Sequence, residues 1–346
     1  MKFRNFVAVN FFFAMRLFWS IAAGQVISIL LALTGFVSVN LNERSFVFPV
    51  LQSTGFYFLL MMFLLTNPFP IGMPVYLYAI LALLDVEANF LAVTAYQYTD
   101  ITSVLLLNSL TIPWVALLSY FALNRRYRKR EMLAIFVCLA GLGLVILSDT
   151  LRGRWSGSEA SSAWIGDLIC VGSSLLYALQ NVLQEYMLKK LAVQSGSTRE
   201  YFGMLGLFGF IISNIQWLVL ERSDILTAGT ALWTSEVIGL FIGFSVIMFS
   251  LYLILGWYIG KFDASLFNMG ILTSGVYGIL LEFAQKKTSP RPASDWMYIL
   301  AYAMIVTGVV AYSVNDKSVD APANPHLRES LAANDKDEKL SHINSV

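Results

Sequence analysis

Residues 83–98 read LLDVEANFLAVTAYQY and lie within an apolar segment, 74–98, that is long enough to cross a membrane. At 1.5 Å per residue this segment forms a helix about 37 Å long, and roughly 20 apolar residues are enough to span the hydrocarbon core. Asp85 and Glu87 therefore fall near the centre of the bilayer. Ionisable groups in that position face the bundle interior or a water-filled path. The stretch predicts a central membrane helix with at least one face lining a cavity.

The composition of the whole chain supports this interpretation. Of the 346 residues, 57% are hydrophobic and 13% are charged, whereas a soluble domain carries about 25% charged residues. The formal net charge of +1 argues against a nucleic-acid-binding protein. Cys138 and Cys170 both lie in apolar segments and provide no disulfide framework. The only histidines, His326 and His342, lie in the polar C-terminal segment, so no histidine-dependent metal or hydrolase site is expected within the spans.

Ten segments have the length and hydropathy of membrane helices. They cover residues 17–39, 46–65, 74–98, 101–123, 132–148, 164–186, 202–220, 234–257, 264–283 and 296–314. The predicted fold class is therefore an all-α polytopic membrane protein with ten transmembrane helices. Residues 1–16 are expected to be a cytoplasmic N-terminus rather than a cleaved signal. Residues 315–346 are polar and lack aromatic side chains, which predicts a disordered cytoplasmic tail.

The distribution of basic residues predicts the orientation. If the N-terminus is cytoplasmic, the inside segments hold more than twice as many Lys and Arg residues as the outside segments. Both termini are therefore expected inside. Basic clusters at 125–130 and 286–291 each precede the last span of one half of the chain. We expect two five-helix repeats, 17–150 and 160–314, and the odd number of spans in each makes the second repeat inverted.

Polar side chains in the third, fourth and sixth spans define the candidate site. Asp85 and Glu87 are two residues apart and project to nearly opposite sides, and Asn89 shares the face of Asp85. Amide and hydroxyl groups suit a polar, largely uncharged molecule, and tyrosine can stack on a flat ring. The candidate substrate-binding residues are Glu87, Asn89, Asn108, Tyr177, Gln180 and Asn181. The candidates for coupling or charge pairing are Asp85, Glu87 and Glu185.

Structural alternatives compete with each of these assignments. Polar bonds between membrane helices are ordinary packing features, and Glu185 lies close enough to the cytoplasmic end to act as an interface anchor with Lys189. The row Gly203, Gly206 and Gly209 follows no strand, so it is not a dinucleotide-binding motif. Close helix packing is the expected role of these glycines.

A secondary carrier explains these features better than the other classes of membrane protein. Asp85 is the only aspartate well inside a span, so an intramembrane aspartyl dyad is not expected. A channel would show charged rings or a filter loop, and neither is present in the sequence. We therefore expect no enzyme activity, no cofactor and no metal site. Substrate is expected near the midplane between the first, third, fourth, sixth, eighth and ninth spans, with alternating access. The alternative is a substrate-sensing or accessory protein with a carrier fold and no net flux.

Four stretches together resemble solute carrier family 35, subfamily F. They are DVEANFLAVTAYQYTDITSVLLLNSLTIPW (85–114), YRKREMLAIFVCLAGLGLVILSD (127–149), YALQNVLQEYMLKK (177–190) and EYFGMLGLFGFIISNIQ (200–216). The likeness extends to GQVISILLALTG (24–35) and more weakly to DASLFNMGILTSGVYG (263–278). It implies the EamA-like drug/metabolite transporter fold, with two inverted five-helix repeats and cytoplasmic termini. The positions that match the family pattern are Glu87, Asn89, Tyr96, Gln97, Tyr98, Thr111, Pro113, Tyr177, Asn181 and Glu185.

The resemblance also shapes the expected substrate. Relatives in the wider family carry nucleotide sugars, and the F branch looks like a carrier of nucleobase-like or nucleoside-like metabolites. This sequence departs from the pattern at Asn108 and Gly275, where the family tends to have aspartates. That puts proton coupling or cation selectivity in doubt. The expected partners are a small-molecule substrate and the lipid bilayer, with no nucleic acid, and a homodimer is left open. The expected location is the plasma membrane or an endomembrane of the Golgi or ER.

Overall fold

The computed structural model describes residues 2–66, 72–98, 104, 107–108, 110–122, 127–151, 160–193, 198–261, 267, 271–275, 277–278, 280–281 and 296–315. The longer helices are α1 (Lys2–Glu43), α2 (Pro49–Met61), α3 (Val75–Ala95), α5 (Thr111–Ala122), α6 (Lys129–Leu151), α7 (Ala160–Val193), α8 (Thr198–Leu220), α10 (Ser235–Lys261) and α13 (Trp296–Asn315). Short elements are η1 (Met62–Thr66), α9 (Arg222–Ala228), η2 (Gly229–Leu232) and η3 (Ile271–Thr273). No strand occurs in these ranges, so the all-α class is confirmed for them.

Each predicted span except 264–283 overlaps one of the longer helices, and half of the residues of 264–283 lie outside the described part of the chain. Four helical segments are long and apolar enough to cross a membrane: Ile21–Glu43, Val75–Ala95, Thr198–Leu220 and Ser235–Lys261. Shorter apolar segments are Pro49–Leu65, Thr111–Phe121 and Ala303–Tyr312. The count of ten spans and the inverted repeat stay predictions. The tail predicted for 315–346 lies outside the described residues from 316 onward.

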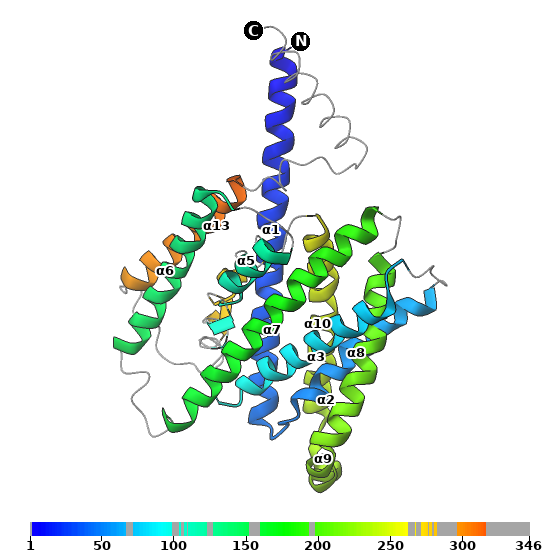
Figure 1. The fold of residues 1–346 in the computed structure, drawn as a ribbon. Coiled ribbons are helices and arrows are strands. Elements are labelled where there is room, and N and C mark those ends of the chain that lie inside the picture. The colour runs from blue at the N-terminus through cyan, green and yellow to red at the C-terminus, as the bar shows by residue number, and fades with distance from the viewer. Residues whose placement is uncertain are drawn as a thin grey trace.

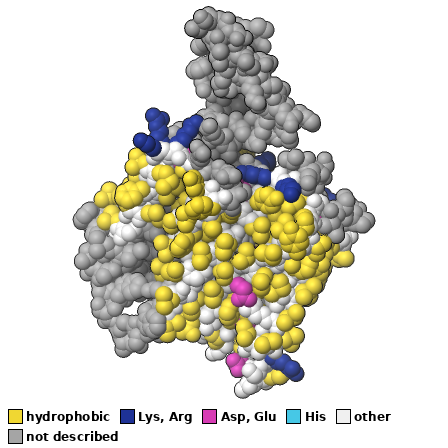
Figure 2. All heavy atoms as spheres, in the orientation of Figure 1, with side chains coloured by type: hydrophobic (Ala, Val, Ile, Leu, Met, Phe, Trp, Pro, Cys, Tyr) yellow, Lys and Arg dark blue, Asp and Glu magenta, His cyan; other side chains and the backbone are white. Residues whose placement is uncertain are grey.

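The helices pack in pairs that join distant parts of the chain (Figure 1). The main pairs are α6 with α13, α2 with α8, α3 with α7, and α1 with α10, and α5 packs on α7. In Figure 1 the start of α1 and the end of α13 lie at the same end of the molecule. The face in Figure 2 is mostly apolar, and basic side chains lie toward its two ends. Elsewhere in the described chain, exposed apolar residues such as Phe121 (70%) and Val219 (76%) are also typical of a lipid-facing surface.

The glycine row of α8 permits the closest of these approaches. A Cβ atom added at Gly203 would lie 2.8 Å from Leu64 Cδ2, and one at Gly209 would lie 2.7 Å from Cε1 of the Tyr57 ring. At Gly206 the added Cβ would meet the backbone of α2 itself, 2.6 Å from the carbonyl carbon of Leu60. The prediction of close helix packing is therefore confirmed, and the partners are α2 and η1.

Two buried glutamates at the ends of α8 hold the starts of α2 and α3. The α2 N-cap, Phe48, makes no side-chain cap and Pro49 has no N–H. Instead, the N–H groups of Val50 and Leu51 donate to Glu221 Oε1 and Oε2, at 2.8 and 2.9 Å. At the other end of α8, Glu200 Oε1 accepts hydrogen bonds from Gly72 N–H (2.8 Å) and the Tyr78 hydroxyl (2.6 Å). These contacts fix α8 to both helices.

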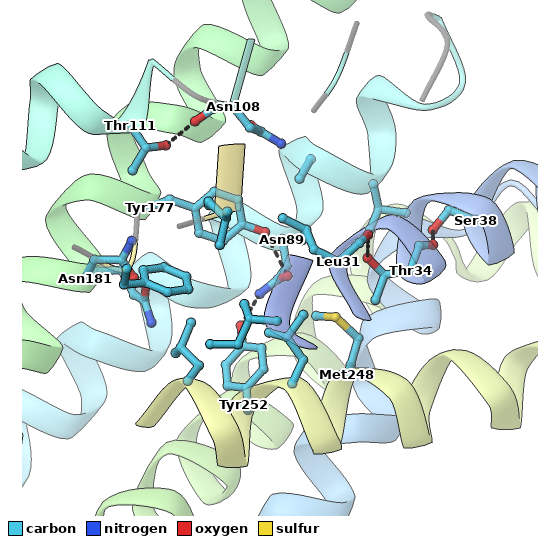
Figure 3. Close-up of a pocket in the computed structure, with 18 of the residues that line it drawn as sticks. Leu31, Thr34, Ser38, Asn89, Asn108, Thr111, Tyr177, Asn181, Met248 and Tyr252 are labelled. Atoms are coloured by element: carbon cyan, nitrogen blue, oxygen red, sulfur yellow. Dashed lines mark hydrogen bonds between the residues drawn. The ribbon is translucent and has the colours of Figure 1, made fainter. Parts of the chain in front are cut away.

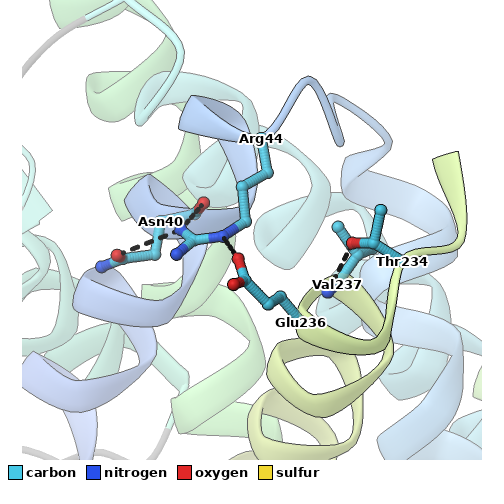
Figure 4. A network of polar contacts seen from close by, with 5 residues as sticks. All are labelled: Asn40, Arg44, Thr234, Glu236 and Val237. Carbon is cyan, nitrogen blue, oxygen red and sulfur yellow. Dashed lines mark hydrogen bonds and ion pairs between the residues drawn. The ribbon is translucent and has the colours of Figure 1, made fainter.

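An exposed ion pair joins the end of α1 to the start of α10 (Figure 4). Arg44 Nε donates to Glu236 Oε2 at 2.9 Å, and a second guanidinium nitrogen donates to the Asn40 carbonyl at 3.0 Å. The side chains are 36% and 71% exposed. Thr234 Oγ1 accepts the Val237 N–H at 3.3 Å and caps α10. Exposed pairs of this kind contribute less than about 1 kcal/mol.

Glu221→Ala is expected to lower the free energy of unfolding by about 1–2 kcal/mol, which is the usual loss when a helix cap is removed. The physical reason is that two N–H groups of α2 lose their acceptor. Glu236→Ala provides the matched control, because it also removes a glutamate near a helix start but only breaks an exposed pair. Thermal unfolding of the purified variants measures both. Equal melting temperatures for the two variants would contradict the capping role of Glu221.

Candidate functional site

A cavity lies where α1, α3, α7 and α10 meet (Figure 3). Its volume is about 90 Å³, which is large enough to hold water or part of a small ligand. The walls also include Asn108, Thr111, Phe267 and Ile271. The cavity is therefore lined by residues from each of the six predicted spans between which substrate is expected: the first, third, fourth, sixth, eighth and ninth. Its other lining residues are Ile27, Leu31, Thr34, Ser38, Asn89, Ala92, Val93, Tyr96, Tyr177, Gln180, Asn181, Phe244, Met248, Leu251, Tyr252 and Leu255.

Asn89 forms the centre of the polar wall. Its amide nitrogen donates to the Tyr252 hydroxyl at 2.8 Å and to the Asp85 backbone carbonyl at 2.9 Å. Its amide oxygen accepts the Tyr177 hydroxyl at 3.0 Å. These contacts join α3, α7 and α10, and Figure 3 shows Asn89 between the two tyrosines. A single amide therefore couples three of the helices around the cavity.

Asp85 lies one layer behind this wall and is fully buried. Its two carboxylate oxygens accept hydrogen bonds from the Tyr57 and Tyr252 hydroxyls, both at 2.7 Å. Asp85 does not line the cavity, but Tyr252 contacts both the carboxylate and Asn89. The carboxylate is therefore connected to the polar wall through one tyrosine.

The opposite wall carries an unused acceptor. The buried Asn108 Oδ1 atom has no hydrogen-bond partner in the described part of the chain. The Asn108 backbone carbonyl accepts the Thr111 hydroxyl at 2.6 Å, as Figure 3 shows. Because α5 begins at Thr111, Pro113 lies in its first turn, where a missing N–H is tolerated. A buried carbonyl without a partner is costly, so this wall is suited to accept a hydrogen bond from a bound molecule.

The predicted site residues fall into two groups. Asn89, Asn108, Tyr177, Gln180 and Asn181 all line the cavity. The remaining predicted residues lie elsewhere. They are Asp85, Glu87 and Glu185, and none of the three lines the cavity.

Glu87 and Glu185 have neighbours of their own. Glu87 is half-buried and accepts a long hydrogen bond from the Gln216 amide, 3.4 Å away on α8. Glu185 is paired with Lys189 one helical turn later, at 2.5 Å. That ion pair is the anchor contact weighed as the alternative for Glu185. A role for either residue in substrate binding or coupling stays a prediction.

Several residues of the site carry no strong signal in the sequence. Tyr57 and Tyr252 lie in apolar spans where tyrosine also occurs at membrane interfaces. Thr34 and Ser38 satisfy their hydroxyls on backbone carbonyls of α1, at 2.7 and 2.9 Å, as isolated helices also allow. Only the position of Asp85, an acid with no basic neighbour in its span, indicates that donors must approach from other helices.

Comparisons of the sequence with known proteins point to solute carrier family 35. The family model SLC35F, solute carrier family 35, matches residues 13–314. Solute carrier family 35 member F2 of Mus musculus is 38% identical over 318 residues, which cover 88% of this chain and 80% of that protein. The Xenopus tropicalis protein of the same name is 30% identical over 87% of this chain and 77% of its own length. A crystal structure with 15% identity has a TM-score of 0.61 and covers 87% of this chain and 99% of that chain, which indicates a shared fold.

Proposed function

Because the chain belongs to solute carrier family 35, whose members are membrane transporters, we propose that its cavity carries a small polar metabolite across a membrane by alternating access. The observation that carries this proposal is the buried cavity with its amide wall on Asn89 and its unpaired acceptor on Asn108. A site of this kind, apolar with a few convergent polar groups, is typical of small-molecule binding. The family names describe carriers and not enzymes.

The proposed substrate is a neutral, ring-bearing compound of the nucleobase or nucleoside class. No Lys or Arg is present among the described residues that line the cavity. The diphosphate of a nucleotide sugar is strongly anionic and is normally held by basic side chains or backbone N–H groups. Nucleotide sugars are therefore the weaker candidates.

The lining chemistry supports a heterocycle in particular. Asn108 offers an acceptor without a partner in the described part of the chain, and the amide groups of Gln180 and Asn181 line the same cavity. Tyr96, Phe244 and Tyr252 provide aromatic faces or edges on the same cavity. Amide pairs read base edges in other proteins, and aromatic side chains stack on base faces. The combination favours a flat molecule with hydrogen-bonding edges.

The proposed architecture is the ten-helix drug/metabolite transporter fold, with repeats 17–150 and 160–314. The packing of α1 on α10 and of α2 on α8 supports it, because each pair joins one half to the other. The start of α1 and the end of α13 lie at the same end of the molecule, as an even number of spans requires (Figure 1). We place both termini in the cytoplasm and the protein in the plasma membrane or in a Golgi or ER membrane.

Asn181→Ala tests the proposal. The initial rate of uptake is expected to fall by roughly three- to tenfold, because the substrate loses one hydrogen bond to the cavity wall. The full-length protein is reconstituted in proteoliposomes and supplied with labelled adenine, uracil, adenosine or UDP-glucose. Uptake of a base or a nucleoside is expected, and UDP-glucose is expected to stay outside.

Asn214→Ala is the matched control for this measurement. Asn214 is also an amide on a membrane helix, but it donates to the Phe210 carbonyl one turn earlier and does not line the cavity. Normal uptake by the Asn181 variant would contradict the assignment of the cavity. Binding of the ligand without uptake by the unmodified protein would favour a sensor over a carrier. Glu87→Gln, measured alongside, tests whether Glu87 contributes from outside the cavity.

A further inference from the structure

A second hollow, separate from the cavity, lies between α5 and α6. It is a groove of about 640 Å³. One side carries Pro113, Ala116, Leu117 and Tyr120 of α5, at the spacing of one helix face. The other side carries Met132, Ile135, Phe136 and Leu139 of α6, at the same spacing. Tyr127, just before that helix, also lines the groove.

These two faces are apolar but do not pack on each other. Among the elements that the structure describes, α5 packs mainly on α7 and α6 packs mainly on α13. Leu117, Met132 and Phe136 remain 50%, 50% and 68% exposed. Facing apolar surfaces that are separated by a groove need an apolar occupant, and in a membrane protein the available one is a lipid chain.

Charge at one end of the groove specifies the kind of lipid. Tyr127 and Met132 both line the groove, and the residues between them include Arg128, Lys129 and Arg130, all exposed. The only acid in that run is Glu131, a buried residue whose carboxylate accepts the Arg128 N–H at 3.0 Å and caps α6. In Figure 2, basic side chains gather at the edge of the apolar surface near the start of α6.

The cations do not help α6 to form. Three positive charges at the start of a helix oppose its dipole, which favours negative charge there. An anionic group bound at this position would be attracted by the side chains and by the helix end together. Tyr120 and Tyr127 at the sides of the groove are residues typical of the headgroup level.

We infer that the groove between α5 and α6 binds an anionic phospholipid, with an acyl chain along the apolar walls and the phosphate at Arg128, Lys129 and Arg130. With the orientation proposed above, these cations face the cytoplasmic leaflet, where anionic lipids are concentrated. The site is independent of the substrate cavity, because no residue lines both. Its test therefore does not depend on transport.

The test uses the full-length protein in vesicles of phosphatidylcholine that contain a trace of photoactivatable phosphatidylserine. Light is expected to attach the probe to peptides of α5 and α6 that line the groove. Unlabelled phosphatidylserine is expected to compete with the probe about tenfold better than phosphatidylcholine that has the same acyl chains. Replacement of Arg128, Lys129 and Arg130 by glutamine removes this preference, since each basic residue near a membrane surface adds to the attraction of anionic lipid. Lys261→Gln, an exposed cation at the end of α10, leaves it unchanged.

Leu117→Trp distinguishes binding of lipid in the groove from attraction of lipid by surface charge alone. The larger side chain fills the groove and is expected to lower labelling of α5 and α6, whereas Leu218→Trp, at a similarly exposed position of α8 (47%), does not. Equal competition by the two lipids would overturn the proposal and leave an ordinary lipid-facing surface. Labelling that maps to other helices would also overturn it. So would the finding that a second copy of the protein occupies the groove.

Discussion

Gly206→Ala is expected to prevent α2 and α8 from packing, with a loss of at least about 3 kcal/mol in the free energy of unfolding. Overpacking usually costs about 1–3 kcal/mol, but here the added Cβ meets backbone atoms of Met61 and Leu60, which cannot rotate away. The helices must separate, and the contacts of Gly203 and Gly209 with Leu64 and Tyr57 are then lost as well. Size-exclusion profiles and thermal unfolding of the purified variant measure the effect.

Gly243→Ala is the control for this prediction. It is the same substitution in an apolar membrane helix, α10, but no atom of another helix lies within 4 Å of the position that the Cβ would take. Alanine also has a higher helix propensity than glycine, so this variant should be at least as stable as the unmodified protein. Closely similar melting temperatures for the Gly206 and Gly243 variants would contradict the close approach of α2 and α8.

Asn89→Ala is expected to reduce uptake by at least about tenfold. The substitution leaves the Tyr177 hydroxyl without its acceptor and removes a donor from Tyr252. A buried polar group that loses its partner costs about 1–3 kcal/mol, and both groups belong to the wall of the cavity. Initial rates in proteoliposomes, normalised to the amount of folded protein, measure the loss with whichever base or nucleoside the unmodified protein accepts.

Tyr177→Phe separates the hydrogen bond from the packing of the wall. It keeps the ring and removes only the hydroxyl that donates to Asn89 at 3.0 Å. A partial loss, smaller than that of the Asn89 variant, is expected because Asn89 keeps its other contacts. If the Asn89 variant transports at the normal rate while remaining folded, the polar wall is not part of the substrate path.

Much of the fold follows from sequence because membrane helices are specified by local composition. Length and hydropathy are enough to locate the apolar segments around α1, α3, α8 and α10. The spacing of Gly203, Gly206 and Gly209 is enough to predict a close helix contact. The identity of the partner is not predictable in this way, because any apolar helix surface would serve. Only the structure shows that α2 is the helix that approaches.

The candidate site is predictable only on the helices where amides interrupt an apolar pattern. Asn89, Tyr177 and Asn181 are found by their spacing, since polar groups in hydrocarbon need a reason to be there. Glu87 satisfies the same criterion, yet the structure turns it toward Gln216. Two residues apart on a helix, Asp85 and Glu87 must point in different directions. Which direction contains the cavity depends on how α3 packs between α7 and α8, and that is long-range information.

The glutamates at the two ends of α8 have a consequence for biosynthesis. The start of α2 is capped by Glu221, 171 residues after Val50, and the start of α3 is tied to Glu200, 128 residues after Gly72. When the ribosome has delivered the first three helices, their opening backbone groups still lack these acceptors. Until α8 is inserted, the N–H groups at the starts of α2 and α3 must therefore donate hydrogen bonds to water or lipid headgroups. Final assembly of the first half therefore requires a helix of the second half, and the two halves expressed as separate chains should each depend on the other to reach a stable form.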